Sequence, residues 1–181
     1  LRVVGAATLA LVLLSSQDAV AQKRFDGVKL TVATFPGAWR QAIIDVTGAQ
    51  VQTHSQDADA LSISPSALVK DDDTITAGTI TLKVIHTPGH TSGSVCYVVG
   101  SHLFSGDTLF PGGPGRTRSP ELFRQEIKSI IDRLFILPGN TIVLPGHGSD
   151  ITIAEAKKEY LVFASKTRED DLHGNVTWLE D

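Results

Sequence analysis

Three short segments of the chain combine histidine or aspartate with glycine and proline at the ends of strand-like runs. Two lie within residues 86–107, HTPGHTSGSVCYVVGSHLFSGD, which place His90 in a Pro-Gly turn and Asp107 after a glycine. The third, residues 144–148, reads LPGHG and carries His147. Imidazole and carboxylate groups bind zinc, and also iron or manganese. Because proline stiffens a turn and glycine opens it, the three segments indicate a metal site with its ligands at strand ends.

The composition limits the class of protein. The chain has 181 residues, enough for one domain with a real core, and 41% of them are hydrophobic. Its net charge of -4 argues against a nucleic-acid partner, which requires a strongly basic face. The single cysteine, Cys96, excludes an internal disulfide and a multi-cysteine zinc cluster.

The first 22 residues have the layout of a secretory signal. Arg2 precedes an apolar run over residues 3–14, and Ala-Val-Ala at residues 19–21 follows a short polar stretch. The run is too short to span a bilayer comfortably, and no later stretch is long and apolar enough for a transmembrane helix. The alternative is a buried pair of strands or a divergent N-terminal segment. Localisation therefore stays open: exported if residues 1–22 are a signal peptide, cytoplasmic otherwise.

The candidate ligands need strands to hold them, and the pattern of side chains predicts these strands. Residues 74–76 and 79–84 alternate polar and apolar side chains around an Ala-Gly pair, which predicts a hairpin. Residues 94–99 and 102–105 form a second pair around Gly-Ser. Residues 141–144 are typical of a buried strand.

Helices are predicted on either side of that last strand. Ser119 and Pro120 open the first helix, with serine as the cap and proline in the first turn. Thr152 and Glu155 form a capping box for a second helix that runs to about residue 165. In the charged tail, Trp178 is predicted to be a packing anchor. Strand pairs followed by helix, strand and helix predict an α/β layered domain.

The three segments in this order resemble the C-terminal half of the metallo-β-lactamase superfamily, especially its glyoxalase II-like hydrolases. The matching pieces are TPGHTSGS at residues 87–94, FSGDTLF at 104–110 and PGHG at 145–148. The resemblance covers roughly residues 45–165. It implies an αββα sandwich with metals at the strand ends between two sheets. Residues 23–181 would then be a single domain of this fold, truncated or degenerate in its N-terminal part.

The resemblance also implies a role for each candidate residue. His90 would bind a first metal, His147 a second, and Asp107 would bridge both as the catalytic carboxylate. The family implies two zinc ions, with iron or manganese as alternatives. A water shared by two such cations loses a proton near neutral pH and becomes a nucleophile. The implied substrate is a small-molecule ester or thioester, and Arg116 could clamp an anionic group on it.

One signature of the family is missing. The superfamily carries His-x-His-x-Asp-His after an early strand, and this motif supplies the other ligands of both metals. The six histidines stand at positions 54, 86, 90, 102, 147 and 173, and no two of them are separated by one residue. Three ligands remain for two sites, whereas a tight dinuclear centre normally needs more. The histidines at 54, 86, 102 and 173 are interpreted as structural or surface residues.

Three hypotheses follow, and they leave open whether the chain is an enzyme. The first is a metal-dependent hydrolase, thioesterase- or glyoxalase II-like, that is impaired because ligands are missing. The second is a non-catalytic pseudoenzyme that keeps the fold as a binding domain. The third is a shifted reading frame or wrong start before about residue 45, in which case the native protein carries the signature. The upstream nucleotide sequence in all three frames would decide the third.

Overall fold

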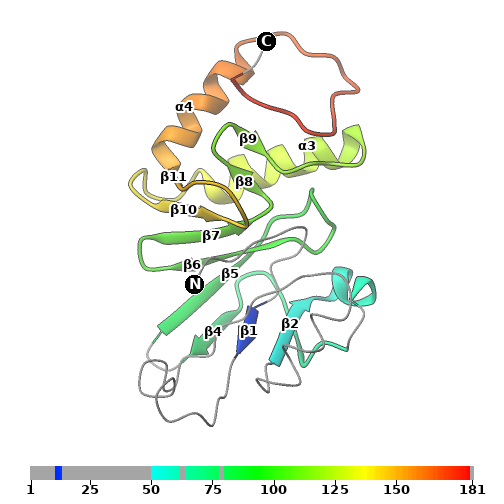
Figure 1. The fold of residues 1–181 in the computed structure, drawn as a ribbon, viewed down its shortest axis with the longest axis vertical. Coiled ribbons are helices and arrows are strands. Elements are labelled where there is room, and N and C mark those ends of the chain that lie inside the picture. The colour runs from blue at the N-terminus through cyan, green and yellow to red at the C-terminus, as the bar shows by residue number, and fades with distance from the viewer. Residues whose placement is uncertain (1–10, 14–49, 62–63, 78–79, 180–181) are drawn as a thin grey trace.

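The computed structural model describes residues 11–13, 50–61, 64–77 and 80–179 (Figure 1). The strands are β1 (Leu11–Leu13), β2 (Gln50–His54), β3 (Ala67–Val69), β4 (Thr74–Ala77), β5 (Ile80–His86), β6 (Val95–Val99), β7 (His102–Gly106), β8 (Leu109–Phe110), β9 (Gly113–Pro114), β10 (Ile142–Pro145) and β11 (Ile151–Thr152). The helices are α3 (Pro120–Ser129) and α4 (Ile153–Ala164), with a 3-10 helix at Ser55–Ala60 and a π-helical turn at Ile130–Leu134. Apart from β1, the predicted signal segment lies outside the described residues.

A six-stranded sheet in the order β11-β10-β7-β6-β5-β4 forms the centre of the fold. Its strands β4 to β7 pair antiparallel in sequence order, so both predicted hairpins are confirmed. Strand β10 joins parallel to β7. The other described strands form a three-stranded sheet, β1-β2-β3, and a small pair, β8-β9.

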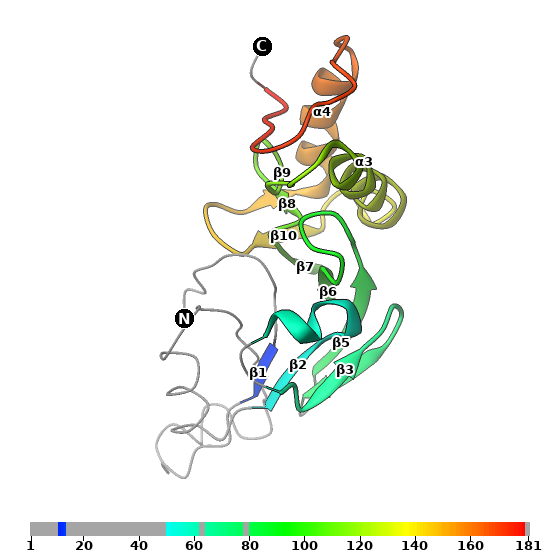
Figure 2. The same ribbon diagram turned by 90° about the vertical axis from the view of Figure 1, so that its right-hand side faces the viewer.

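Side chains alternate along β5 and β6, so each face of the larger sheet has its own core. On one face, Ile85 and Cys96 are buried with apolar residues of α3, the π-helical turn and α4. On the other face, Val84 and Tyr97 are buried with Val69 of β3. The described residues therefore stack as helices, larger sheet and smaller sheet, which is the layered α/β arrangement predicted (Figures 1 and 2).

Both helices begin where the sequence predicts. The Ser119 hydroxyl caps α3 by accepting a hydrogen bond from the Leu122 N–H at 3.4 Å. At α4, the Thr152 hydroxyl accepts from the Glu155 N–H at 3.2 Å, and the Glu155 carboxylate accepts from the Thr152 N–H at 3.0 Å. These reciprocal bonds form the predicted capping box. None of the helices in the described residues has both the length and the apolar character needed to cross a bilayer.

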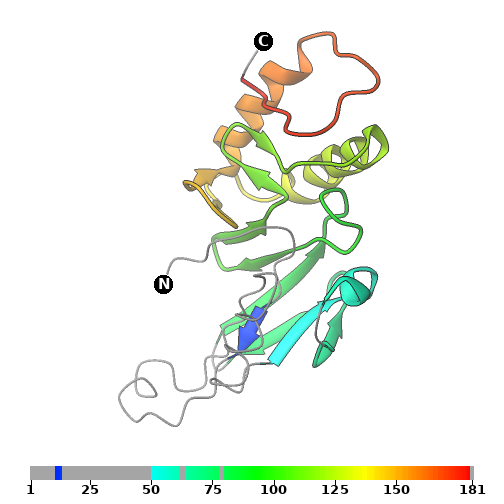
Figure 3. The ribbon, with the colours of Figure 1, turned by 45° about the vertical axis from the view of Figure 1, so that its right-hand side comes forward.

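The tail after α4 turns back across the domain instead of leaving it (Figure 3). Thr117 and Gly174 exchange two backbone hydrogen bonds, each 3.1 Å long, and the Trp178 N–H donates to the Gly112 carbonyl at 2.7 Å. The Trp178 side chain is completely buried against the rings of Phe135 and Tyr160. The predicted packing anchor is thus confirmed, and it fixes the tail beside the β8-β9 pair.

Candidate metal centre

The three predicted ligands follow strands that run in the same direction. Strands β7 and β10 are parallel, and β5 has their direction because it is antiparallel to β6, which is antiparallel to β7. His90 follows β5, Asp107 follows β7 and His147 follows β10. The carboxyl ends of such strands meet at one edge of a sheet, which is a common place for functional sites. The topology therefore collects at one edge residues that are far apart in the sequence.

The side chains converge on the carboxylate of Asp107. His90 Nε2 lies 3.8 Å from Asp107 Oδ2, and His147 Nε2 lies 3.9 Å from Asp107 Oδ1. The Asp107 side chain is 8% exposed and that of His90 is 16% exposed, while His147 is 56% exposed at the outer side. Each oxygen of one carboxylate thus faces a different imidazole.

The orientation of the His90 ring is fixed by a backbone carbonyl. Nδ1 of His90 lies 2.8 Å from the carbonyl oxygen of Arg116. Since a carbonyl oxygen only accepts hydrogen bonds, Nδ1 carries a proton and donates it. Nε2 is then the ring nitrogen on the side of Asp107. Histidines that bind metals usually have such an outer hydrogen bond, which selects the tautomer and orients the ring.

Gly146 allows the end of β10 to approach Asp107 closely. Its N–H donates to the Gly106 carbonyl at 2.7 Å. A Cβ atom at this position would lie only 2.5 Å from Asp107 Oδ1, well inside van der Waals contact. A side chain here would displace the carboxylate, so the glycine before His147 is required by the geometry of the centre.

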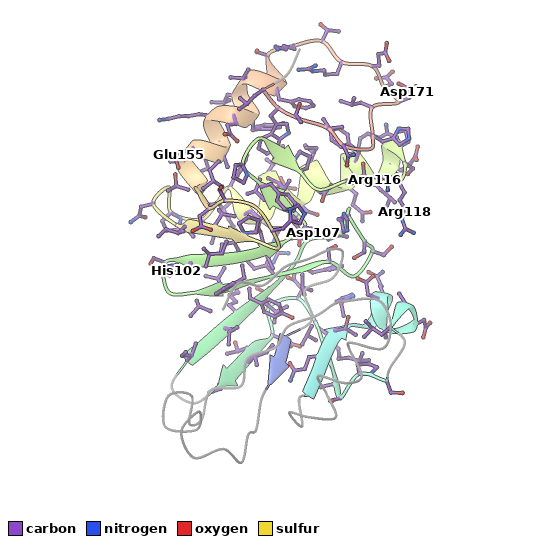
Figure 4. All side chains as sticks on the ribbon, in the orientation of Figure 1. His102, Asp107, Arg116, Arg118, Glu155 and Asp171 are labelled. Atoms are coloured by element: carbon purple, nitrogen blue, oxygen red, sulfur yellow. The ribbon has the colours of Figure 1, made fainter. Side chains whose placement is uncertain are left out.

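An open pocket of about 680 Å³ lies in front of these residues, with Asp107 and Arg116 both among its lining (Figure 4). The remaining lining comes from strands β8 and β9, the turns after β5, β8 and β10, the segment before α3 and the tail: His90, Phe110, Pro111, Pro114, Gly115, Arg118, His147, Gly148, Ser149 and Asn175. The Phe110 ring packs on His147 with centroids 4.5 Å apart. Of the two arginines in this lining, Arg116 and Arg118, the sequence predicted a role for Arg116.

Arg118 is a lining residue that the sequence analysis missed. Arg116 and Arg118 are both exposed, on either side of the buried Thr117. In an extended segment, residues two apart point to the same side. The alternation in Gly-Arg-Thr-Arg could therefore have indicated that both guanidinium groups reach the pocket.

Glu126 of α3 is a second residue that was missed. It is completely buried, and neither carboxyl oxygen has a hydrogen-bond partner of good geometry in the described residues. The pKa of Glu126 is raised to about 9, mainly by burial and to a smaller extent by the charge of Asp107, while backbone groups of Gly115 and His90 oppose the shift. A neutral acid therefore lies behind the centre. Its position three residues after Phe123, on the buried face of the helix, was the available signal.

Each histidine–aspartate pair is close enough for both of its side chains to reach a single cation. Two ligands at about 2 Å from one ion can be separated by at most about 4 Å, and both histidine–aspartate pairs meet this limit. However, no three His, Cys, Asp or Glu side chains in the described ranges are grouped so that they could hold one ion. All six histidines are described, and only His90 and His147 of these line the pocket.

The other histidines are placed away from the pocket. The rings of His54 and His86 stack on each other, with centroids 4.1 Å apart and an interplanar angle of 10°. His102 is exposed at the β6-β7 hairpin, and His173 is exposed in the tail with Nδ1 near the Asp171 carbonyl. Cys96 is buried, which raises the pKa of its thiol to about 11, so it does not act as a thiolate.

Comparison with known proteins identifies the family of this chain. A family model described as "Metallo-beta-lactamase superfamily" matches residues 23–147. An uncharacterised protein of Mycobacterium leprae is 42% identical over 98 residues, covering 50% of this chain and 44% of that protein. A hydroxyacylglutathione hydrolase of Xanthomonas campestris is 44% identical over 97 residues, covering 51% of this chain and 35% of the hydrolase. The chain thus spans less than half the length of these two relatives.

Solved structures show the same fold. ETHE1 from Myxococcus xanthus superposes with a TM-score of 0.61 and 33% identity, covering 72% of this chain and 58% of that one. TTHA1623 in a di-iron-bound form gives a TM-score of 0.54 and 25% identity, covering 65% of this chain and 67% of that one. These neighbours confirm the predicted αββα sandwich with a truncated N-terminal part. The chain therefore belongs to the metallo-β-lactamase superfamily.

Proposed function

We propose that this site belongs to a metal-dependent hydrolase that cleaves a small-molecule ester or thioester. The observation that carries the proposal is the convergence of His90 and His147 on separate oxygens of Asp107. The bond from His90 Nδ1 to the Arg116 carbonyl supports it, because it leaves Nε2 available as a ligand atom. His90 and His147 would each hold one cation, and Asp107 would bridge the two. A bound zinc, iron or manganese ion would supply a nucleophilic water at neutral pH.

The substrate is proposed to carry an anionic group. Arg116 and Arg118 stand on the pocket lining, where Asp107 is the single acidic residue among the described ones and lies between the two histidines. Guanidinium groups bind carboxylates through two parallel hydrogen bonds, so the arginine pair suits a substrate carboxylate. The hydroxyacylglutathione hydrolase of Xanthomonas campestris is named for a thioester substrate, which makes S-acyl glutathione the first compound to test.

A second candidate is a non-catalytic binding domain with the same fold. The specific observation in its favour is the ligand count: of six histidines, two line the pocket, and each faces one oxygen of the same carboxylate. Such a domain would still bind an anionic molecule through Arg116 and Arg118. It would not hydrolyse it, because a weakly held cation does not generate hydroxide at neutral pH.

Zinc is expected to bind this chain weakly. Each proposed cation site has two protein ligands, one histidine and the shared Asp107, whereas structural zinc sites normally have four and catalytic sites three. After dialysis against metal-free buffer, elemental analysis should find well under one equivalent of zinc, and the same for iron and manganese. Close to two tightly held equivalents would contradict the prediction. The variant Asp107→Asn is the control, since it removes the shared charge and should retain even less.

Hydrolysis is expected to be slow for the same reason. With added zinc, turnover of an S-acyl glutathione thioester should be close to the uncatalysed rate. A variant with the full His-x-His-x-Asp-His signature grafted between Ala33 and Ala42 should gain activity. Adding Asp107→Ala to the graft should abolish that gain, by a factor of about 100 or more if the cation provides the nucleophile. Comparable turnover in all three proteins would show that the metal interpretation of the site is wrong.

A further inference from the structure

We propose that Asp57 is a positioning residue for His90. Asp57 lies in the 3-10 helix that follows β2, while His90 lies in the loop between β5 and β6. The two residues are thus far apart in sequence and belong to segments that follow different sheets. The inference relies on the proposed function only for the role of His90; the contacts on which it is based are independent of the reaction.

Asp57 is 5% exposed, and both of its carboxylate oxygens hold the His90 loop. Oδ2 accepts a hydrogen bond from the Thr91 hydroxyl at 2.6 Å, and Oδ1 accepts one from the Gly93 N–H at 2.9 Å. A Cβ atom at Gly93 would lie 2.6 Å from Asp57 Cγ, so the loop packs directly on the carboxylate. Hydrogen bonds to an ionised acceptor are stronger than neutral ones, so these two contacts hold the loop firmly.

Thr91 connects the Asp57 carboxylate to the backbone around His90. Its carbonyl accepts from the Gly89 N–H at 3.0 Å, and its own N–H donates to the Ser94 hydroxyl oxygen at 3.0 Å. Because the single proton of the Thr91 hydroxyl goes to Asp57, the Ser94 hydroxyl must donate to Thr91 Oγ1 across their 2.7 Å contact. His90 is therefore the central residue of a hydrogen-bonded turn, Gly89 to Thr91, and Asp57 holds the last residue of this turn.

The segment that carries Asp57 is itself tied to the same loop. The His54 ring caps the 3-10 helix by accepting from the Gln56 N–H at 3.3 Å. His54 also stacks on His86, whose Nε2 lies 2.9 Å from the Ser92 carbonyl and so donates to it. Two separate connections therefore join this helix to the loop, one through Asp57 and one through the stacked histidines.

The contacts of Asp57 with the loop determine the orientation of the His90 ring. The ring keeps Nε2 towards Asp107 only while Nδ1 reaches the Arg116 carbonyl, and that requires the loop to stay in place. If the Asp57 contacts are lost, the loop can move and the bond from Nδ1 to the carbonyl is weakened. The tautomer of His90 thus reports on the loop directly, without metal and without substrate.

The test measures this tautomer by long-range ¹⁵N–¹H correlation spectra of the metal-free protein, with His90→Gln to assign the signals. In the parent chain, His90 should be the Nδ1–H tautomer. Asp57→Ala and Thr91→Val should shift the tautomer equilibrium towards Nε2–H by at least about tenfold, because each variant removes the hydrogen bond between Thr91 and the charged Asp57, and one such bond corresponds to about that factor. Amide exchange at Gly93 should rise by a similar factor, about tenfold, in Asp57→Ala.

Matched variants separate positioning from general loss of structure. Thr91→Ser keeps the hydroxyl and should retain the parent tautomer, and Asp59→Ala removes an exposed carboxylate from the same 3-10 helix and should do the same. If Asp57→Ala fails to fold, Thr91→Val is the deciding variant, since it only replaces the hydroxyl with a methyl group of similar size. A parent tautomer in Thr91→Val would overturn the proposal, even if thioester hydrolysis were observed. Conversely, a shifted tautomer would support it even if no hydrolysis were found.

Discussion

Replacing Glu126 with glutamine is expected to raise the free energy of unfolding by several kcal/mol at pH 8. Burial raises the pKa of Glu126 from 4.5 to about 9. Between these two values the carboxyl is protonated in the folded chain and ionised in the unfolded chain, so folding takes up a proton. The native state therefore loses stability as the pH rises from about 4.5 towards 9, at up to about 1.4 kcal/mol per pH unit. Glutamine removes this penalty because it never ionises.

Urea unfolding at pH 5, 6.5 and 8, with a chelator present, would measure the effect. At pH 5 the parent chain and Glu126→Gln should differ little, since the carboxyl is then protonated in the folded chain and only partly ionised in the unfolded one. The difference between their free energies of unfolding should increase as the pH rises. Glu121→Gln, at an exposed position in the same helix, is the control and should keep the pH dependence of the parent. Parallel pH profiles for the parent chain and Glu126→Gln would contradict the prediction.

Replacing Trp178 with alanine is expected to lower the free energy of unfolding by about 3–5 kcal/mol. The indole is completely buried and contacts the rings of Phe135, Tyr160 and Phe163. Loss of the indole leaves a cavity in the core on the helical face of the larger sheet. The tail also loses the side chain that holds it against the domain. Because Asn175 belongs to the same tail and lines the pocket, the wall of the pocket should loosen as well.

Thermal and urea unfolding would test this prediction, with Leu179→Ala as a neighbouring control. Leu179 is 55% exposed, so its truncation should have little effect. Trp178→Phe should have an intermediate effect, since it keeps an aromatic ring and removes an indole N–H that lacks a hydrogen-bond partner in the described residues. Equal stability of Trp178→Ala and Leu179→Ala would show that the tail is not part of the core.

The order of elements was predictable because it depends on local rules. Alternating side chains specify β4 to β7, and the caps at Ser119 and Thr152 specify where the helices begin, since both signals act over a few residues. The three turns around the candidate ligands were also visible in the sequence, because a glycine directly precedes His90, Asp107 and His147. Their assembly could be inferred only through the family resemblance, because the pairing of β7 with β10 spans some 40 residues of chain.

The sequence by itself determined which donor residues exist: six histidines, no His-x-His-x-Asp-His motif and one cysteine. The number of possible ligands is a property of composition, and no fold can add to it. The tertiary structure decided which groups surround these donors. Arg118 at the rim, Glu126 behind the site and Asp57 against the His90 loop all act across contacts between distant segments. The desolvation of a carboxyl and the direction of an imidazole depend on those contacts, so local sequence patterns do not encode them.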